Sequence, residues 1–243
     1  ELDVSLDAAA QVNLYAAIKP VLEKNNSRLI VISHSLAFMS TVADGELYYL
    51  EETPSGITLE PRSFGYIKSD LFGFKGGYER YILTEDEVLE GLLIYIINNY
   101  SIHCYYQYVI IGVGGVNQLE LIINKNDTSP IFADSKNVLC VVDGDSYPNF
   151  FENYKGAAAT ISAPVDDIEK YIFSNRDKLF PDIGKPHYTE SADTKRASKS
   201  YWKWLTHDKK IDKQELYQII VDIDQSKTNE MVSEISCFLG KLK

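Results

Sequence analysis

Val138-Leu-Cys-Val-Val-Asp143-Gly-Asp145 is an uninterrupted apolar run that stops at two carboxylates. A run that is apolar on both faces predicts a strand buried on both sides, as in the parallel sheets of α/β proteins. Upstream, Tyr81-Ile-Leu-Thr ends at Glu85, and the apolar run 108–111 ends in a glycine turn that begins at Gly112. Sites of α/β proteins lie at the carboxyl ends of such strands. The sequence therefore predicts an α/β domain with acids gathered at one edge of its sheet.

The pair Asp143 and Asp145 favours a metal. Positions i and i+2 put both side chains on one face of an extended strand end, and Gly144 between them has no Cβ to obstruct them. Two close carboxylates repel each other unless a cation lies between them, and hard oxygen ligands without Cys or His favour Mg²⁺ or Mn²⁺. The alternative is a polar turn after a core strand, since Asp-Gly is a common turn dipeptide.

In the order glutamate, glycine-rich turn, Asp-x-Asp, residues 81–145 resemble the Toprim domain of topoisomerases, primases and OLD-family nucleases. The resemblance implies metal-dependent cleavage of a nucleic acid, with DNA as the expected substrate. It also implies a metal held by Glu85, Asp143 and Asp145 that polarises the scissile phosphate and activates water. The Ile168-Glu169 pair resembles one that follows the Asp-x-Asp strand in OLD-like domains, so Glu169 is a further candidate ligand. A solvated helical glutamate is the alternative.

The chain departs from the Toprim pattern after its glutamate. The family usually has glycine there, whereas Glu85 is followed by Asp86, and the second acid expected one turn later falls at Leu89. Asp86, Glu87 and Glu90 stay open as candidates for that position, so one or two metals are expected. The departure and the acidic balance favour an alternative function, an ATPase subunit whose degenerate Toprim domain is a scaffold or partner sensor. A primase- or topoisomerase-like Toprim is a third, without a supporting tyrosine domain or zinc finger.

A lysine from the C-terminal region is expected to neutralise charge that develops at the phosphate. Lys199 is the first choice, and Lys185, Lys195 and Lys203 compete with it. Lys and Trp interleave in residues 195–204, which suits phosphate binding and base stacking. The alternative is an ordinary amphipathic helix with a solvated basic face.

The start of the chain resembles the latter half of an ABC-type ATPase head. In that family a Walker B strand ends in a catalytic Glu, a D-loop and a helix follow, and the next strand ends in the switch His. Glu1, Ser5, Asp7 and His34 match these roles in order. The resemblance implies ATP binding, with Glu1 polarising the attacking water and His34 touching the γ-phosphate. A strand-end histidine beside a helix cap is the alternative for His34.

No phosphate loop accompanies these residues, because Gly184-Lys185 is followed by Pro186 and lacks the upstream glycine. A chain that begins inside a motif is expected to be the C-terminal part of a longer ATPase–nuclease, and as given it should not hydrolyse ATP. Heads of this type work as dimers, so a homodimer, or a higher oligomer formed through the ATPase head, is expected. OLD-family proteins commonly act in antiphage defence, including beside retrons, which implies a possible partner subunit or RNA.

The composition limits the function classes. A chain of 243 residues that is 45% hydrophobic can bury a substantial core. A net charge of −11 argues against wrapping DNA by bulk electrostatics, although bound divalent cations would invert the local field. Apolar runs such as 92–97 are too short for a bilayer, and no signal peptide is present, so no membrane partner is expected. Scattered Cys104, Cys140 and Cys237 fit a reducing cytoplasm.

We expect four segments: an ATPase lobe in residues 1–65, a linker at 66–79 in a region rich in Gly, Phe and Ser, a Toprim domain with a parallel, Rossmann-like sheet at 80–185, and a helical tail at 186–243. Within them the patterns predict a strand at 28–33 and a hairpin of 45–51 with 56–60. Helices are predicted at 8–24, 35–42, 87–100, 116–124, 166–173, 191–205, 213–223 and 228–239.

Overall fold

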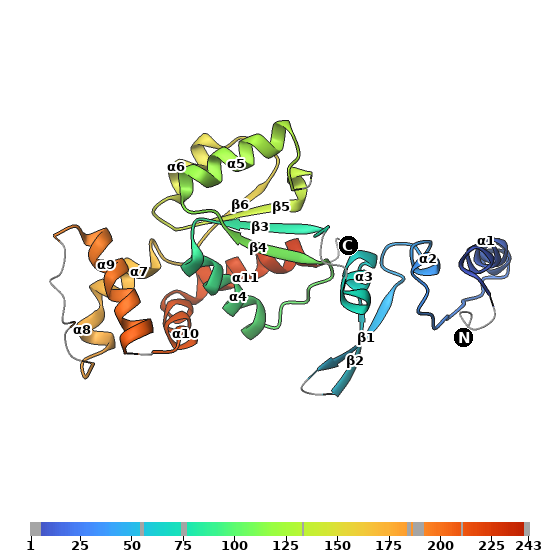
Figure 1. The fold of residues 1–243 in the computed structure, drawn as a ribbon, viewed down its shortest axis with the longest axis horizontal. Coiled ribbons are helices and arrows are strands. Elements are labelled where there is room, and N and C mark those ends of the chain that lie inside the picture. Colours follow the sequence, from blue (N-terminus) through green and yellow to red (C-terminus); the bar gives the residue numbers. More distant parts are fainter. Residues whose placement is uncertain are drawn as a thin grey trace. The chain divides into compact units, whose positions relative to one another are not determined.

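A computed structural model describes residues 6–53, 56–73, 77–132, 134–183, 186, 192–209 and 211–240. The chain divides into two compact units, the first of residues 1–77 with 105–107 and the second of residues 78–104 with 108–243. The protein is mixed α/β, and a four-stranded parallel sheet lies in the second unit (Figure 1).

In the first unit, helices accompany an antiparallel hairpin. Its elements are α1 (Ala8–Lys24), α2 (Leu36–Met39), β1 (Tyr48–Thr53), β2 (Gly56–Pro61) and α3 (Phe64–Phe72). The predicted hairpin is confirmed, since β1 pairs with β2 from Tyr48 opposite Pro61 to Thr53 opposite Gly56. Residues 66–79, expected as a linker, include most of α3, whose N-cap Ser63 accepts a hydrogen bond from Tyr66 N at 3.0 Å. Because the region is rich in Gly, Phe and Ser, its composition did not indicate that Ser63 begins a helix.

The predicted strand at residues 28–33 is wrong. No strand forms there, and in the described part of the chain this segment pairs with no other. A strand is stabilised by backbone hydrogen bonds to a neighbour, so an apolar pattern is insufficient without one. Ile30 and Ile32 accordingly remain 93% and 72% exposed.

The second unit is built on β3 (Arg80–Thr84), β4 (Tyr108–Gly112), β5 (Val138–Val142) and β6 (Ala159–Ser162). The spatial order is β4-β3-β5-β6, and every neighbouring pair is parallel. The three predicted strands of this unit are confirmed. The fourth, β6, was not predicted, because Ala-Thr-Ile-Ser after a run of small residues has little strand pattern.

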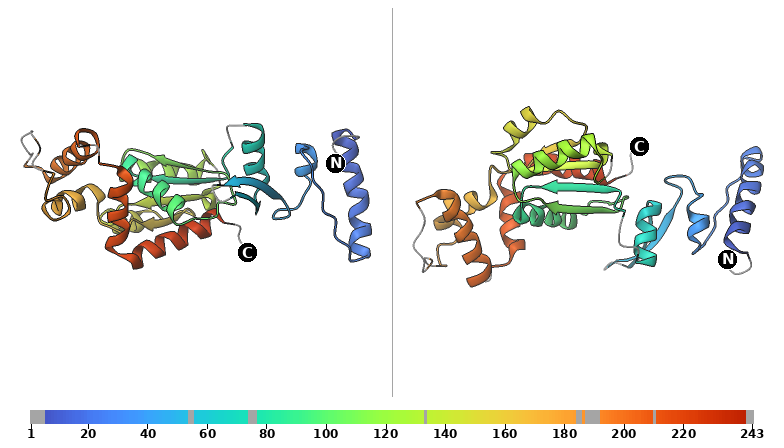
Figure 2. Two further views of the ribbon diagram at one scale, coloured as in Figure 1. Left: turned by 90° about the horizontal axis from the view of Figure 1, so that it is seen from below. Right: turned by 45° about the horizontal axis from the view of Figure 1, so that its top comes forward.

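Helices cover both faces of this sheet (Figures 1 and 2). On one face lie α5 (Val116–Thr128) and α6 (Tyr147–Asn153), and on the other lie α4 (Glu87–Asn99) and α11 (Gln225–Leu239). The side chains of β5 alternate between the two cores: Leu139 and Val141 pack on the α4 side, Cys140 and Val142 on the α5 side. Every residue of β5 is therefore buried, as its continuous apolar run predicts.

The C-terminal helices belong to the α4-side core. They are α7 (Ile168–Ser174), α8 (Arg176–Leu179), α9 (Thr194–Lys203), a π-helical turn (Trp204–Asp208), α10 (Lys213–Ile223) and α11. Trp202, Leu216 and Ile235 pack in one cluster with Leu92 and Leu139. The described residues of the expected tail, 186–243, thus share a core with the sheet. The helices predicted in the second unit are confirmed with shifted ends, although Ser191 lies outside the described residues. No described helix is long and apolar enough to cross a membrane.

The connections reverse direction between β3 and β5. From β3 the chain continues to β4 on one side, then crosses to β5 on the other side. The helix that follows β3 covers one face of the sheet, and the helix that follows β5 covers the other. Loops that diverge in this way leave a crevice at the carboxyl ends of the two strands. Glu85 and Asp143 directly follow these strands, so the topology brings both to the crevice.

Candidate active site

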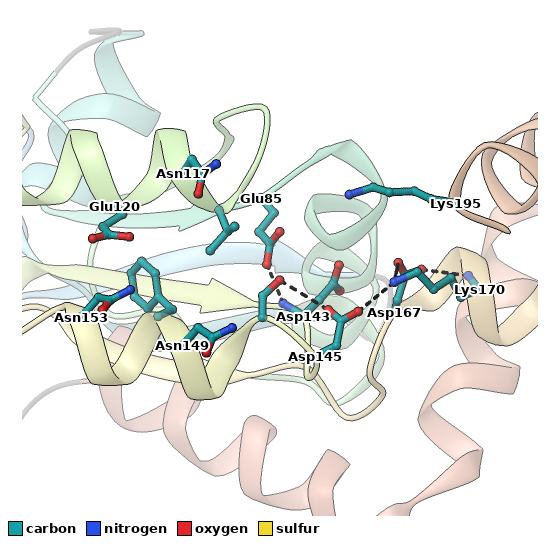
Figure 3. A pocket seen from close by; sticks show the side chains of 13 residues that line it. Glu85, Asn117, Glu120, Asp143, Asp145, Asn149, Asn153, Asp167, Lys170 and Lys195 are labelled. Atoms are coloured by element: carbon teal, nitrogen blue, oxygen red, sulfur yellow. Dashed lines mark hydrogen bonds and ion pairs between the residues drawn. The ribbon is translucent and has the colours of Figure 1, made fainter. Parts of the chain in front are cut away.

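A cavity of about 490 Å³ opens at the carboxyl ends of β3 and β5. Glu85, Asp143 and Asp145 all line it, together with Asp167 and Lys170 (Figure 3). Glu85 Oε1 accepts a hydrogen bond from Asp143 N at 3.1 Å, across 58 residues of sequence. The fold therefore brings the three predicted acids together.

Backbone contacts fix the turn that carries the two aspartates. Gly144 N donates to Val165 O at 3.0 Å, and Asp145 N donates to Asp166 O at 3.1 Å. A Cβ on residue 144 would lie 2.8 Å from Val165 O, closer than side-chain carbons approach other atoms. Glycine is therefore required for this turn to lie against the loop after β6.

We expect Gly144→Ala to lower the free energy of unfolding by roughly 1–3 kcal/mol, the usual cost of forcing an extra methyl group into packed structure. Urea denaturation followed by circular dichroism measures the change. Glu152→Ala, an exposed change on the following helix, should alter stability by less than about 0.5 kcal/mol. Equal stability of Gly144→Ala and the native protein would show that the turn has room for a side chain.

Asp143 lies in the most strongly acidic part of the cavity. Burial, together with the negative charges of Glu85 and Asp167, raises its pKa from the ordinary 3.8 to about 9. Burial also raises the pKa of Glu85, opposed by its hydrogen bond from Asp143 N. The arrangement therefore disfavours ionised carboxylates unless positive charge enters the cavity.

Lys170 supplies part of that positive charge. Its Nζ lies 2.8 Å from Asp145 Oδ2 and 3.2 Å from Asp167 Oδ2. The hydrogen bond to Asp145 is the main cause that raises the pKa of Lys170. One ammonium group thus bridges two carboxylates that line the cavity and offsets one of their two negative charges.

The donor set suits a hard divalent cation in kind, because carboxylate oxygens are the ligands that Mg²⁺ and Mn²⁺ prefer. As placed, however, no three His, Cys, Asp or Glu side chains among the described residues form a group that could hold a metal ion. Lys170 holds Asp145, and Glu85 is turned to a backbone amide. Glu85, Asp143 and Asp145 would be the ligands, and Asp145 must exchange its lysine for the metal.

Glu169 faces a second, smaller hollow, which it lines with Asp86, Asp143 and Asp167. Burial raises the pKa of Glu169 to about 7, opposed by the charge of Lys199. Lys199 Nζ lies 3.8 Å from Glu169 Oε2.

The lysines of α9 are placed differently. Lys199 is paired with Glu169, whereas Lys195, one turn earlier, lines the main cavity. In Figure 3 the Lys195 ammonium group points back toward the acids. Lys185 lies outside the described residues, and Lys203 lines neither hollow. The lysine that lines the main cavity is therefore Lys195 and not Lys199, the first choice from the sequence.

Glu90 is brought into neither hollow. Its carboxylate accepts a hydrogen bond from Gly112 N at 3.2 Å. A Cβ at Gly112 would lie 3.0 Å from the backbone of Asp86, and Gly114 N donates to Glu85 O at 2.7 Å. The glycine turn after β4 therefore packs on the end of β3 and helps to fix Glu85.

The other two acids that follow β3, Asp86 and Glu87, do not line the main cavity. Asp86 caps α4 by accepting hydrogen bonds from Val88 N at 3.0 Å and Leu89 N at 3.1 Å. It also lines the smaller hollow, whereas Glu87 is exposed and lines neither.

Of the residues matched to an ATPase, Glu1 and Ser5 lie outside the described residues. Asp7 caps α1, accepting a hydrogen bond from Ala10 N at 2.8 Å. His34 precedes Ser35, the N-cap of α2. The structure thus places Asp7 and His34 beside the starts of two helices.

Sequence reasoning missed Asp167 and Lys170. Both follow β6, and without that strand nothing placed them at the sheet edge. The available signal was Asp166-Asp167 before an apolar helical pattern, which is typical of an N-cap; Asp167 accepts a hydrogen bond from Lys170 N at 2.8 Å.

Comparisons of the chain with protein-family models, curated proteins and solved structures found no match. The geometry of the site therefore carries the functional argument.

Proposed function

We propose that the second unit is an OLD-like Toprim domain that hydrolyses phosphodiester bonds of nucleic acid, most favourably DNA, with Mg²⁺ or Mn²⁺. The observation that carries the proposal is the meeting of Glu85 with Asp143 and Asp145 where the strand order of a parallel sheet reverses. Sequence order and spatial position then agree with a metal-dependent nuclease.

The acids at the strand ends and the two lysines of the cavity have separate tasks in this proposal. Glu85, Asp143 and Asp145 would hold the metal, which when bound supplies a Lewis acid for the phosphate and an activated water. Lys195 neutralises negative charge that develops on the phosphate. Lys170 orients Asp145 and Asp167 while the cavity is without substrate. The carboxylates would therefore bind the metal cation, and Lys195 would bind the phosphate anion.

ATP control is proposed from the first unit's resemblance to an ABC-type head, in which Glu1, Ser5, Asp7 and His34 would contact the nucleotide. A homodimer, a role in antiphage defence beside a partner subunit or RNA, and a cytoplasmic location belong to the same proposal. ATP control and the homodimer rest on the motif order at the start of the chain, the defence role on the OLD-family resemblance, and the location on the scattered cysteines.

A second candidate function is favoured by one specific observation. Lys170 already satisfies two carboxylates, and the described acids form no ready metal group. A domain whose acids are paired with a lysine and do not hold a metal would serve an ATPase as a scaffold or partner sensor without cutting nucleic acid.

Metal dependence separates the two candidates. We expect the protein to cut plasmid, linear DNA or RNA in Mg²⁺ or Mn²⁺, and Glu85→Gln to raise the Mn²⁺ concentration for half-maximal cleavage, because hard cations prefer a charged carboxylate oxygen to a neutral amide. Glu87→Gln makes the same change at an exposed position two residues away and should leave that concentration unaltered. If the native protein cuts none of these substrates in either metal, the scaffold function replaces the nuclease.

A further inference from the structure

The main cavity has two chemically different sides. Beyond the acids on one side lie Lys170 and Lys195, and on the other side lie polar residues of α5 and α6 (Figure 3). These polar residues, here named the amide arm, are Asn117, Glu120, Asn149 and Asn153. A ligand that spans the acids therefore meets cations at one end and amides at the other.

Helical spacing explains how the amide arm is formed. Asn117 and Glu120 are three residues apart on α5, and Asn149 and Asn153 are four apart on α6. Each pair therefore lies on one face of its helix. Figure 3 shows the two pairs approaching the cavity from the two helices. Phe150, which is 1% exposed, anchors α6 in the core and also lines the cavity.

The polar groups of the amide arm are available to a ligand. Within the described part of the chain, no side-chain hydrogen bond or ion pair joins any of the four to another protein group. The three amides offer both donors and acceptors, whereas Glu120 offers acceptors only. Glu120 therefore favours a ligand that donates hydrogen bonds, and the amides can meet either a donor or an acceptor.

These features favour a nucleobase over a phosphate. Glu120 repels phosphate, so the charged backbone of a bound strand belongs on the side of Lys170 and Lys195. The exocyclic amino groups of adenine, cytosine and guanine are donors that a carboxylate accepts, and asparagine pairs with the edge of adenine. The edge of a base is freest to meet the side chains that line this cavity when the nucleotide is unpaired and unstacked.

We propose that the amide arm binds the unpaired nucleotide next to the scissile phosphate and selects bases that carry an exocyclic amino group. This inference rests on the proposed nuclease function. Glu120 is the selecting acceptor, and Asn149 and Asn153 hold the remaining polar edge of the base.

Binding of mononucleotides tests the inference without requiring cleavage. Isothermal titration of the full chain in Mg²⁺ compares adenosine and cytidine 5′-monophosphates with the uridine and inosine forms, which lack the amino group at the corresponding position. We expect the first two to bind roughly tenfold more tightly, the effect of one hydrogen bond to a charged acceptor. Glu120→Gln and Asn149→Ala should remove most of that preference. Glu152→Gln, an exposed change on α6 outside the cavity, should retain it.

Cleavage of single-stranded oligonucleotides that differ at one base next to the cut should follow the same order. Equal binding of the four nucleotides, or an unchanged preference in Glu120→Gln, overturns the inference. A preference that follows the 2′-hydroxyl between ribose and deoxyribose forms overturns the assignment to the base. A binding preference in a protein that cuts no nucleic acid supports the base site and rejects the nuclease function, so the two failures are distinguishable.

Discussion

Replacing Asp143 by asparagine is expected to reduce Mg²⁺- or Mn²⁺-dependent cleavage about 1,000-fold, the scale at which a group that stabilises charge at the reacting centre contributes. Asp143 lines both the main cavity and the smaller hollow beside Glu169. Asparagine keeps the size of the side chain but removes the charge that attracts a cation. Initial rates on a labelled oligonucleotide measure the loss.

The same substitution is expected to stabilise the metal-free protein at alkaline pH. Burial raises the pKa of Asp143 to about 9 in the folded chain, whereas an unfolded aspartate keeps its ordinary 3.8. A raised folded pKa contributes stability that is complete below pH 3.8 and is lost as pH rises toward 9. Because each pKa unit corresponds to about 1.4 kcal/mol and water at the cavity mouth weakens the effect, we expect Asp143→Asn to gain at least about 2 kcal/mol at pH 8.

Urea denaturation in a chelator at pH 4 and pH 8 measures this gain, which should be small at the lower pH. Saturating Mg²⁺ should reduce the difference, because it stabilises only the native sequence by binding. Asp166→Asn makes the same change at an exposed position of the neighbouring loop and should affect neither cleavage nor the pH dependence. Lower stability of Asp143→Asn at pH 8, or unchanged cleavage, would contradict the proposed role. An acid that costs stability and is required for activity is the pattern of a functional residue.

The acids that follow β3 and β5 could be predicted from sequence because their signal is local. A buried parallel strand is apolar on both faces, so its end at Glu85 or Asp143 is visible in a few residues. The position of Asp167 and Lys170 depends on β6 pairing with β5, which is a tertiary contact of a strand with little pattern of its own. That part of the site was therefore not predictable from periodicity.

The same distinction explains the other differences. The apolar residues of 28–33 show a strand pattern, but nothing in the pattern says whether a partner strand is present. Trp202 and Leu216 have the spacing of apolar helix faces, yet the sequence did not show that these faces pack in one core with α4. Periodicity predicts which face of an element is buried, and tertiary structure decides what buries it.

The second large expected effect is the loss of cleavage rate when the lysine that faces the phosphate is removed. We expect Lys195→Ala to lower the cleavage rate about 100-fold, because its ammonium group lines the main cavity where charge develops on the phosphate. Lys199→Ala should lower it less than about tenfold, because Lys199 is paired with Glu169 at 3.8 Å and lines neither hollow.

Each variant controls for the other, since both remove one positive charge from α9 four residues apart. Lys195→Arg should recover part of the rate, because it keeps the charge but changes its reach. Single-turnover rates at saturating substrate separate this effect from weaker binding, and Mn²⁺ titration should show unchanged metal affinity in Lys195→Ala. If Lys199→Ala proves the more damaging, the charge on the phosphate is neutralised by the lysine paired with Glu169, and the scissile bond lies nearer to Glu169 than to the amide arm.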